Sequence, residues 1–309
     1  MAGAATDADS REVAGGTPPV SRETAPSAAA PIAAASAASR QRRGSFPRPA
    51  QRRVIAVANQ KGGVGKTTSA VNIAAALAQD GATVALVDLD PQGNASTALG
   101  LDATHRTPGT YEVLLGEATL DEVLVPCADV ERMLCSPSAV DLAGAEVELV
   151  NEQQRERRLH DALQRLAAPV DYVIIDCPPS LGLLTVNGLT AAQEVLIPIQ
   201  CEYYALEGLG QLMRNVELVR KHLNPSLYVS SILLTMYDPR TRLAEQVVQE
   251  VRAHFGATVL STAIPRSVRV AEAPSYGRTV VTYDPASRGA LSYMDAAREI
   301  AERGLETAA

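Results

Sequence analysis

The residues best suited to chemistry lie in one glycine-rich segment, QKGGVGKTT at residues 60–68. It follows a β-branched apolar run and opens a stretch with helical spacing, which is the context of a phosphate-binding loop. Its glycines let backbone N–H groups turn inward around an anion, and the helix N-terminus adds partial positive charge. We expect Lys66 to neutralise the β- and γ-phosphates of a nucleotide, and the Thr67 hydroxyl to bind Mg²⁺. The expected nucleotide-binding residues of the loop are Lys61, Gly62, Gly63, Val64, Gly65, Lys66, Thr67 and Thr68.

Three aspartates follow predicted strands further along the chain. Asp88 and Asp90 stand two residues apart after one apolar run, and Asp176 ends the run YVIID. Carboxylates in these positions suit Mg²⁺ coordination and the positioning of an attacking water. Asp176 is placed as a Walker B acid, which would hold Mg²⁺ through water. Taken singly, each aspartate also fits a cap at a strand–helix turn, but the phosphate loop upstream favours the metal interpretation.

A regular framework must position these motifs, and from Val54 onward short apolar runs alternate with helical stretches. Near-continuous apolar strands are typical of parallel strands covered on both faces. The sequence therefore predicts an α/β fold with a doubly wound, mostly parallel sheet and helices on both faces. Ligands bind such sheets at the carboxyl ends of the strands, where the motifs fall. The predicted strands are residues 54–58, 83–88, 172–175, 195–199, 228–235, 259–264 and 279–283, and the predicted helices are residues 67–79, 151–166, 207–223, 243–255 and 288–303.

The first 52 residues differ from the rest in composition. They are rich in Ala, Pro and Ser and poor in large apolar residues, so they cannot bury enough surface to offset the entropy of ordering. We predict a disordered tail at residues 1–52 and a P-loop ATPase domain at residues 53–309. The basic end of the tail fits either a solvated segment or an arm that binds DNA, a membrane or a partner. Its arginines are Arg40, Arg42, Arg43, Arg48, Arg52 and Arg53.

The chain of 309 residues is 46% hydrophobic and has a formal net charge of −7. Its length suits one large α/β core, and its bulk charge gives no indication of nucleic-acid binding, so a DNA contact must come from a local patch. No apolar run is long enough to predict a membrane span. The four cysteines include no CxxC pair, which favours reduced, buried thiols over a zinc site or a disulfide framework. They are Cys127, Cys135, Cys177 and Cys201.

The loop departs from the common pattern G-x-x-x-x-G-K-[ST], because Gln60 takes the place of the first glycine and Lys61 follows it. This variant, KGGVGKTT, resembles the deviant phosphate loop of the ParA/MinD group. The resemblance implies that Lys61 reaches across a nucleotide-sandwich homodimer to the partner's phosphates, where a cation in trans stabilises charge on the transferred phosphoryl group. It also implies that Asp90 orients the attacking water and that Asp88 supports the Mg²⁺ shell. The implied catalytic residues are Lys61, Lys66 and Asp90, and the implied metal residues are Thr67, Asp88 and Asp176.

Further segments narrow the resemblance to chromosomal ParA/Soj proteins over residues 53–303. They are VDLDPQGNAST, IDCPPSLGLLT, PIQCEYYALEGL, LLTMYDPRT and IPRSVRVAEAPSYG. The resemblance implies a cytoplasmic, nucleoid-associated ATPase for chromosome (or plasmid) partition, with ATP and Mg²⁺ as cofactors. ATP drives dimerisation, the dimer binds double-stranded DNA without sequence preference, and a ParB-type partner stimulates hydrolysis and release. Implied adenine contacts are Met236, Tyr237, Pro265 and Arg266, and implied DNA contacts are Arg240 and Arg269, although each arginine alone also fits a solvated surface residue.

Other activities of the same superfamily stand as alternatives. A MinD-like membrane-positioning ATPase would end in a basic amphipathic helix, whereas REIAERGLETAA has no aromatic residue and no basic cluster. An ATP-dependent amide or carboxylate-activating synthetase would need an acceptor pocket, for which the sequence shows no constellation. A scaffold without catalysis is disfavoured by Asp90. Cys177 beside Asp176 invites an iron–sulfur interpretation, but no second cysteine has cluster spacing, and a buried thiol is favoured.

Overall fold

Eight strands form one sheet, in the order β3–β4–β2–β5–β1–β6–β7–β8, in the computed structural model, which describes residues 45–102, 104, 106–202 and 205–306. Neighbouring strands are parallel except β3 and β4. The strands are β1 (Arg53–Val57), β2 (Val84–Asp88), β3 (Val125–Pro126), β4 (Met133–Ser136), β5 (Tyr172–Asp176), β6 (Glu194–Gln200), β7 (Tyr228–Tyr237) and β8 (Val259–Pro265).

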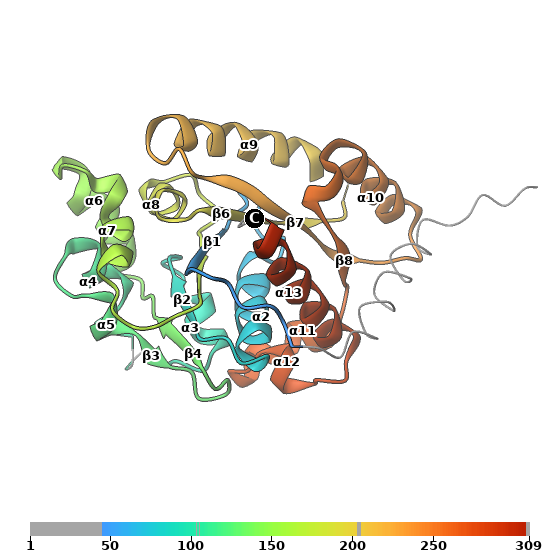
Figure 1. The fold of residues 1–309 in the computed structure, drawn as a ribbon, viewed down its shortest axis with the longest axis horizontal. Helices are drawn as coiled ribbons and strands as arrows, with labels where there is room; N and C mark the ends of the chain where they lie inside the picture. Colours follow the sequence, from blue (N-terminus) through green and yellow to red (C-terminus); the bar gives the residue numbers. More distant parts are fainter. Residues whose placement is uncertain (1–44, 103, 105, 203–204, 307–309) are drawn as a thin grey trace, which may run out of the picture.

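Helices cover both faces of the sheet (Figure 1), with α2 and α13 on one side and α8, α9 and α10 on the other. The helices are α2 (Lys66–Gln79), α3 (Asn94–Ala98), α4 (Thr110–Leu115), α5 (Leu120–Val123), α6 (Leu142–Glu148), α7 (Arg158–Arg165), α8 (Leu183–Ala191), α9 (Ala205–His222), α10 (Arg242–Phe255), α11 (Val268–Glu272), α12 (Val280–Tyr283) and α13 (Arg288–Glu306). Among the described helices, none has the length and apolar character needed to cross a bilayer.

Alternate side chains of the central strand β1 pack into two separate apolar clusters. Val54 and Ala56 join the cluster under α7, α8, α9 and α10. Ile55 and Val57 join the cluster under α2, α12 and α13. Because successive side chains of a strand point to opposite faces, this division shows that both faces of the sheet are buried. The predicted fold class, a mostly parallel sheet with helices on both faces, is confirmed.

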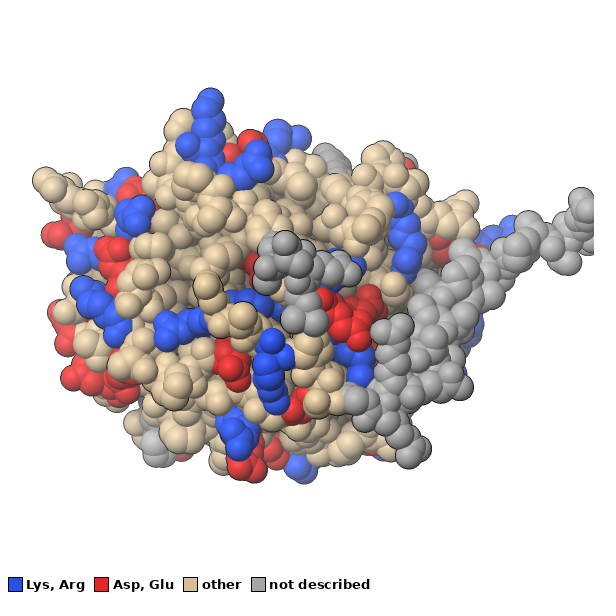
Figure 2. Space-filling view, in the orientation of Figure 1, with Lys and Arg blue, Asp and Glu red and all other residues tan. Residues whose placement is uncertain are grey.

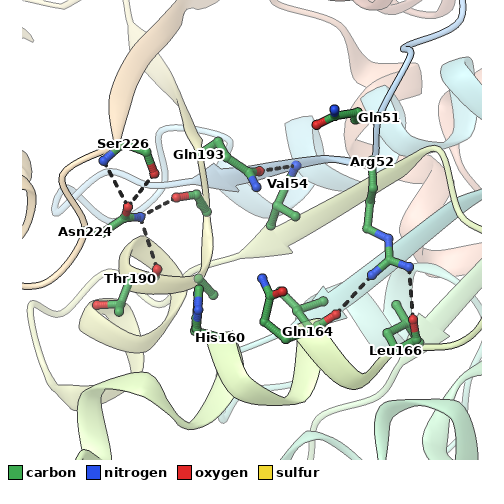
Figure 3. A pocket seen from close by; sticks show the side chains of 13 residues that line it. Gln51, Arg52, Val54, His160, Gln164, Leu166, Thr190, Gln193, Asn224 and Ser226 are labelled. Atoms are coloured by element: carbon green, nitrogen blue, oxygen red, sulfur yellow. Dashed lines mark hydrogen bonds between the residues drawn. The ribbon is translucent and has the colours of Figure 1, made fainter.

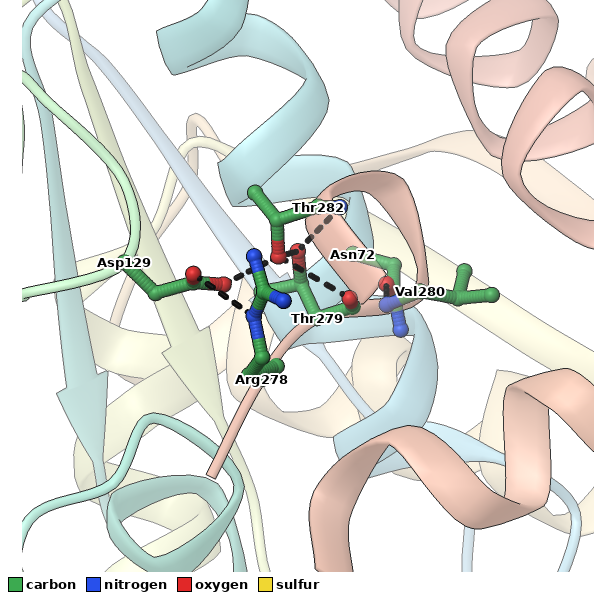
Figure 4. Close-up of polar contacts among 6 residues, drawn as sticks. All are labelled: Asn72, Asp129, Arg278, Thr279, Val280 and Thr282. Carbon is green, nitrogen blue, oxygen red and sulfur yellow. Dashed lines mark hydrogen bonds and ion pairs between the residues drawn. The ribbon is translucent and has the colours of Figure 1, made fainter. Parts of the chain in front are cut away.

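The strand predicted at residues 279–283 is wrong, because this segment forms the short helix α12. The Thr279 hydroxyl accepts a hydrogen bond from the backbone N–H of Thr282 at 3.3 Å and caps the helix. Asn72 of α2 accepts the N–H of Val280 at 2.8 Å, and Asp129 accepts bonds from Arg278 and Thr282 (Figure 4). The apolar run was read as a strand, but these side-chain caps satisfy the donors that a strand would pair with a neighbour.

The helix predicted at residues 151–166 is shorter than expected. Only α7 is α-helical there, and it is preceded by one-turn 3₁₀ segments at Leu149–Asn151 and Arg155–Arg157. Gln154 has φ +55°, a left-handed conformation that interrupts the helical hydrogen-bond ladder. Strands β3 and β4 and helices α3 to α6, α8 and α11 were not predicted from the sequence.

Residues 1–44 of the predicted tail lie outside the described residues, but its last residues pack against the domain. Phe46 is buried, and its ring lies under the guanidinium of Arg298 at 4.9 Å. Its N–H donates to the carboxylate of Asp80, beyond the end of α2. Arg52 donates to the carbonyls of Leu163 and Leu166, at 3.0 Å each. The packed part of the chain therefore begins before residue 53, because one aromatic side chain anchors a segment of otherwise polar composition.

Candidate nucleotide-binding site

The carboxyl ends of β1, β2 and β5 meet at one edge of the sheet and bring the predicted motifs together. Asp176 of β5 lies in register with Val57 of β1 on one side and with Asp88 of β2 on the other. The N–H of Leu89 donates to the carbonyl of Asp176 at 3.0 Å. The phosphate loop, which follows β1, and the acidic segment, which follows β2, therefore lie on either side of Asp176.

Two glycines of the phosphate loop adopt left-handed backbone conformations. Gly63 has φ +75° and Gly65 has φ +88°, values that side-chain-bearing residues rarely adopt. Gly65 is the N-cap of α2, where no side chain caps the helix and no acidic residue occupies the first turn. The first N–H groups and the positive end of the helix dipole are thus left for an anion from outside the chain. This geometry fits the phosphates of a nucleotide.

Lys66 is a desolvated cation at the start of α2. Its side chain is buried, and Nζ donates to the backbone carbonyl of Lys61 at 3.1 Å. Burial lowers the pKa of Lys66, while the charges of Asp176 and Asp90 act in the opposite direction. A partly desolvated ammonium gains most from a close anion. A polyphosphate held by the loop would supply that anion.

Lys61 has a different environment, although it stands five residues away. Its Nζ lies 3.3 Å from Oε2 of Glu202, and the two side chains are 39% and 46% exposed. Gln200 donates to the other oxygen of Glu202. The backbone N–H of Lys61 donates to Oδ1 of Asn59 at 3.0 Å. The ammonium of Lys61 therefore stays near the surface, where it is held by Glu202 just after the end of β6.

Asp88 fixes the segment that follows β2. Its Oδ2 accepts hydrogen bonds from the N–H and the hydroxyl of Ser96, at 2.8 and 2.7 Å. Its Oδ1 accepts the N–H of Asp90 at 3.2 Å. Burial raises the pKa of Asp88 to about 6, against the effect of the Ser96 bonds. The carboxylate thus holds the turn and the start of α3, in addition to facing Asp176.

Asp90 lies in the same turn, and one of its carboxylate oxygens already accepts a hydrogen bond. Its Oδ1 accepts the N–H of Gln92 at 3.0 Å, and its carbonyl accepts the hydroxyl of Ser138 at 2.7 Å. A Cβ on Gly93 would lie 2.7 Å from the carbonyl oxygen of Ser138. The turn therefore fits closely against the segment after β4, and this contact fixes the position of Asp90.

The carboxylate of Asp176 is buried, and neither oxygen meets full hydrogen-bond geometry with a described residue, although the Thr67 hydroxyl lies close enough to interact with it. Burial, followed by the charge of Asp88, raises the pKa of Asp176 well above its ordinary value. A buried carboxylate with so few protein donors fits a site completed by a cation and its water shell. No group of three or more His, Cys, Asp or Glu side chains among the described residues is arranged to hold a metal alone. Mg²⁺ keeps several waters and takes ligands from nucleotide phosphates, so one buried carboxylate that acts through water fits it.

A cavity of about 230 Å³ opens beside the phosphate loop. Met236, Pro265 and Arg266 line it, whereas Tyr237 is not among the lining residues. The Tyr237 carbonyl instead accepts the N–H of Arg266 at 3.1 Å. Met236 has φ +51°, a left-handed conformation at the register shift between Leu234 and Tyr237 of β7. The remaining lining residues are Gly65, Thr68, Thr235, Ile264, Ser267, Val270, Ala271 and Tyr293.

The two arginines that the resemblance assigns to DNA lie beyond the carboxyl ends of β7 and β8. The side chains of Arg240 and Arg269 are 86% and 55% exposed. They lie at the same end of the strands as the phosphate loop, because β1, β6, β7 and β8 are neighbours that run parallel. Each is paired with a carboxylate of its own segment.

A hollow of about 360 Å³ lies at the other end of the strands, away from every motif (Figure 3). Arg52, Asn224 and Gln193 lie around it, and each forms hydrogen bonds with backbone groups. Asn224 alone donates to three carbonyls, those of Leu189, Thr190 and Ala192. These polar side chains therefore hold the ends of α7 and α8 and the start of β1.

Comparison with known proteins identifies the family. The model of a family described as an AAA domain matches residues 52–229. Over 251 residues the chain is 52% identical to the chromosome partitioning protein ParA of Myxococcus xanthus, covering 81% of this chain and 88% of that protein. It is 51% identical to the sporulation initiation inhibitor protein Soj of Bacillus subtilis over 252 residues, which are 82% of this chain and 99% of that protein.

The chain belongs to the ParA/Soj family of chromosome-partitioning ATPases.

One solved structure with a ParA/Soj-like fold carries a different name. It is a cobyrinic acid a,c-diamide synthase from Mycobacterium smegmatis with bound ADP and magnesium, 42% identical, with a TM-score of 0.70, covering 82% of this chain and 93% of that one. Its name corresponds to the synthetase alternative. Curated ParA/Soj relatives are more similar in sequence, and the alternative is not favoured.

Four residues around the ParA/Soj-type site were not predicted from the sequence. Glu202 holds Lys61, Ser96 and Ser138 hold the acidic turn, and the Thr235 hydroxyl donates to the carbonyl of Val64 at 2.8 Å. Glu202 and Thr235 stand at or near the carboxyl ends of β6 and β7, so the rule that ligand sites form there could have indicated them. Nothing in the sequence pattern indicates Ser138, because it lies 48 positions from Asp90. Ser96 lies only 8 positions after Asp88, in the same segment VDLDPQGNAST.

Proposed function

We propose that this chain is an ATP-dependent switch for chromosome or plasmid partition, which hydrolyses ATP to ADP and phosphate. ATP-bound protomers form a sandwich homodimer that binds double-stranded DNA without sequence preference. A ParB-type partner stimulates hydrolysis and thereby releases the dimer from DNA. The protein would act in the cytoplasm at the nucleoid. The membership in the ParA/Soj family and the form of the phosphate loop support this proposal.

The arrangement of four side chains at one edge of the sheet supports ATP chemistry. Lys66 would bind the β- and γ-phosphates, the Thr67 hydroxyl would ligate Mg²⁺, and Asp176 would hold the Mg²⁺ water shell. Bound Mg²⁺ would neutralise charge that develops on the phosphates. Asp90 would orient the attacking water, because it lies in the turn that Asp88 and Ser138 fix. Fixed donors and carboxylates of this kind lower the barrier without reorganising during the reaction.

The environment of Lys61 carries the dimer proposal. Its side chain is 39% exposed, and its ammonium is held by Glu202 rather than directed into its own phosphate loop. A cation at the surface next to a nucleotide site is available to the phosphates of a second copy. ATP would then form part of the dimer interface, so that hydrolysis weakens the association.

The proposal is tested by sedimentation with DNA in the presence of ATP, ADP or no nucleotide, at two salt concentrations. We expect the chain to sediment with DNA only when ATP is present. The affinity for DNA should fall steeply at the higher salt concentration, because arginine–phosphate contacts release counterions. The same samples are analysed by light scattering for dimer formation. Equal sedimentation under all three nucleotide conditions would exclude an ATP-controlled DNA switch.

A further inference from the structure

Arg240 is held by a carboxylate two residues away. Its Nε donates to Oδ1 of Asp238 at 2.9 Å, and its Nη2 donates to Oδ2 at 2.8 Å. This two-point geometry is also the one in which a guanidinium binds a phosphate. The carboxylate therefore occupies the two N–H donors of Arg240 that would bind a DNA phosphate.

Arg269 is held in the same manner from two sides. Its Nη1 lies 3.2 Å from Oε2 of Glu272 on α11, and its Nε lies 3.4 Å from Oδ2 of Asp284 beyond α12. Both arginines assigned to DNA are thus paired within the protomer. Figure 2 shows one face of the molecule, on which basic and acidic side chains are intermixed.

The two paired arginines belong to adjoining segments. Tyr237 of β7 and Pro265 of β8 are register partners, so the turns that follow these strands start side by side. The N–H of Arg266 donates to the carbonyl of Tyr237 at 3.1 Å. The hydrogen bonds of Arg240 chiefly lower the pKa of Asp238, and the charge of Arg266 acts on it in the same direction. One carboxylate therefore influences more than one potential phosphate contact.

These ion pairs are solvent-accessible, so a competing anion can break them. Arg240 is 86% exposed and Asp238 is 21% exposed. Exposed ion pairs are weak and screened by salt. A single phosphate contact that must first displace a carboxylate adds little to the free energy of DNA binding. When linked sites make several such contacts at once, their free energies add.

We propose that Asp238, together with Glu272 and Asp284, competes with nucleic-acid phosphates for Arg240 and Arg269. The inference rests on the proposed DNA-binding function and specifies how that surface is regulated. A lone protomer binds DNA weakly because each arginine must exchange an internal partner for a phosphate. Two protomers joined by ATP present twice the number of arginines on one assembly, and only that assembly binds firmly. The carboxylates thus sharpen the dependence of DNA binding on ATP.

The test is the variant Asp238→Asn, which removes the charge and keeps the shape. Its amide oxygen can still accept the N–H of Arg240, a bond of 3.1 Å in the present turn. Glu250→Gln on α10 is the matched control, because it removes one exposed carboxylate of the following helix that holds neither arginine. ATPase activity and thermal unfolding of both variants are compared with those of the unmodified chain, and we expect no change.

DNA affinity is measured by fluorescence anisotropy with a labelled duplex, at several salt concentrations, with and without ATP. We expect Asp238→Asn to bind about fivefold more tightly than the unmodified chain, and to retain measurable binding without ATP. The slope of log K against log salt should steepen by about one per protomer, because no carboxylate takes up a cation when the arginine engages DNA. Adding Arg240→Ala should abolish the gain, as expected for coupled residues.

Two other results have opposite meanings. If the unmodified chain binds DNA with ATP, but Asp238→Asn behaves like Glu250→Gln in affinity and slope, the carboxylate competition is wrong and the proposed function stands. If neither the unmodified chain nor Asp238→Asn binds DNA with any nucleotide, the proposed function is wrong and the competition fails with it.

Discussion

The Nζ of Lys66 donates a hydrogen bond to the backbone carbonyl of Lys61 at 3.1 Å, so the buried lysine of the loop is held by the backbone of the exposed one. A nucleotide would take Lys66 from this carbonyl and give it phosphate oxygens instead. Binding of ATP therefore changes a contact at Lys61, the residue proposed to act on the other protomer.

The two lysines should separate nucleotide binding from dimerisation. Lys66→Ala removes the buried cation of the loop, and we expect ATP affinity to fall more than 100-fold, which corresponds to about 3 kcal/mol. Lys61→Ala leaves that cation in place, and we expect ATP affinity to stay within about threefold while the ATP-dependent dimer is lost. Titration with a fluorescent ATP analogue and light scattering measure the two quantities. An ATP-dependent Lys61→Ala dimer would contradict the role in trans.

Asp90→Ala should trap an ATP-bound dimer. The turn stays anchored by Asp88 and Ser96, so we expect nucleotide binding to persist while turnover falls at least tenfold, since water positioning typically contributes two to four orders of magnitude. Phosphate release and light scattering with ATP are the measurements. A monomer with unchanged turnover would show that Asp90 does not position the water.

Arg240→Ala combined with Arg269→Ala should abolish DNA binding and preserve the ATP-dependent dimer. Both side chains are exposed, so we expect their loss to change stability by less than about 0.5 kcal/mol. Each removed phosphate contact should lower the salt slope by about 0.9. DNA sedimentation and light scattering are compared on the same preparation. Loss of the dimer instead would place these arginines in the interface between protomers.

Phe46 should contribute to stability although it lies in a segment of tail-like composition. Its ring is 3% exposed and packs under Arg298, so Phe46→Ala should lower the free energy of unfolding by about 2–4 kcal/mol. Urea unfolding measures this change. Deletion of residues 1–44 retains the contact and is the control, expected within about 0.5 kcal/mol of the unmodified chain. A deletion that extends to residue 50 should match Phe46→Ala.

Asp88 should make stability depend on pH when Mg²⁺ is absent. Its pKa is raised in the folded chain to about 6, so folding favours the protonated form. The stability that this protonation contributes is fully present below about pH 4, the pKa of an aspartate in the unfolded chain. It is lost as the pH rises through about 6, the pKa in the folded chain. Comparison of urea unfolding at pH 4.5 and pH 7 in EDTA should show a fall of about 2 kcal/mol from this group. Asp88→Asn should remove that part of the fall. If the free energy of unfolding of this variant depends on pH as it does in the unmodified chain, Asp88 is not the cause.

The sequence predicted the strands that carry the motifs because each combines a buried apolar run with a following Gly or Asp. Tyr172–Asp176 and Val84–Asp88 agree with their predictions within one residue. The segment at residues 279–283 failed because Asn72, 208 positions away, accepts its N–H. Glu202 was missed for the same reason, since its pairing with Lys61 depends on the adjacency of β1 and β6. Local pattern thus located the phosphate loop, while long-range contacts decided what holds it.

Helix α2 links the phosphate loop to the anchor of Phe46, because Lys66 begins the helix and Asp80 follows its last residue. Fourteen helical residues span about 20 Å. A fluorescent protein or affinity tag joined ahead of Ser45 would therefore be tethered some two nanometres from the nucleotide, at the opposite end of α2. A label at that position would leave uncovered the phosphate-loop end of α2, where two copies are proposed to meet.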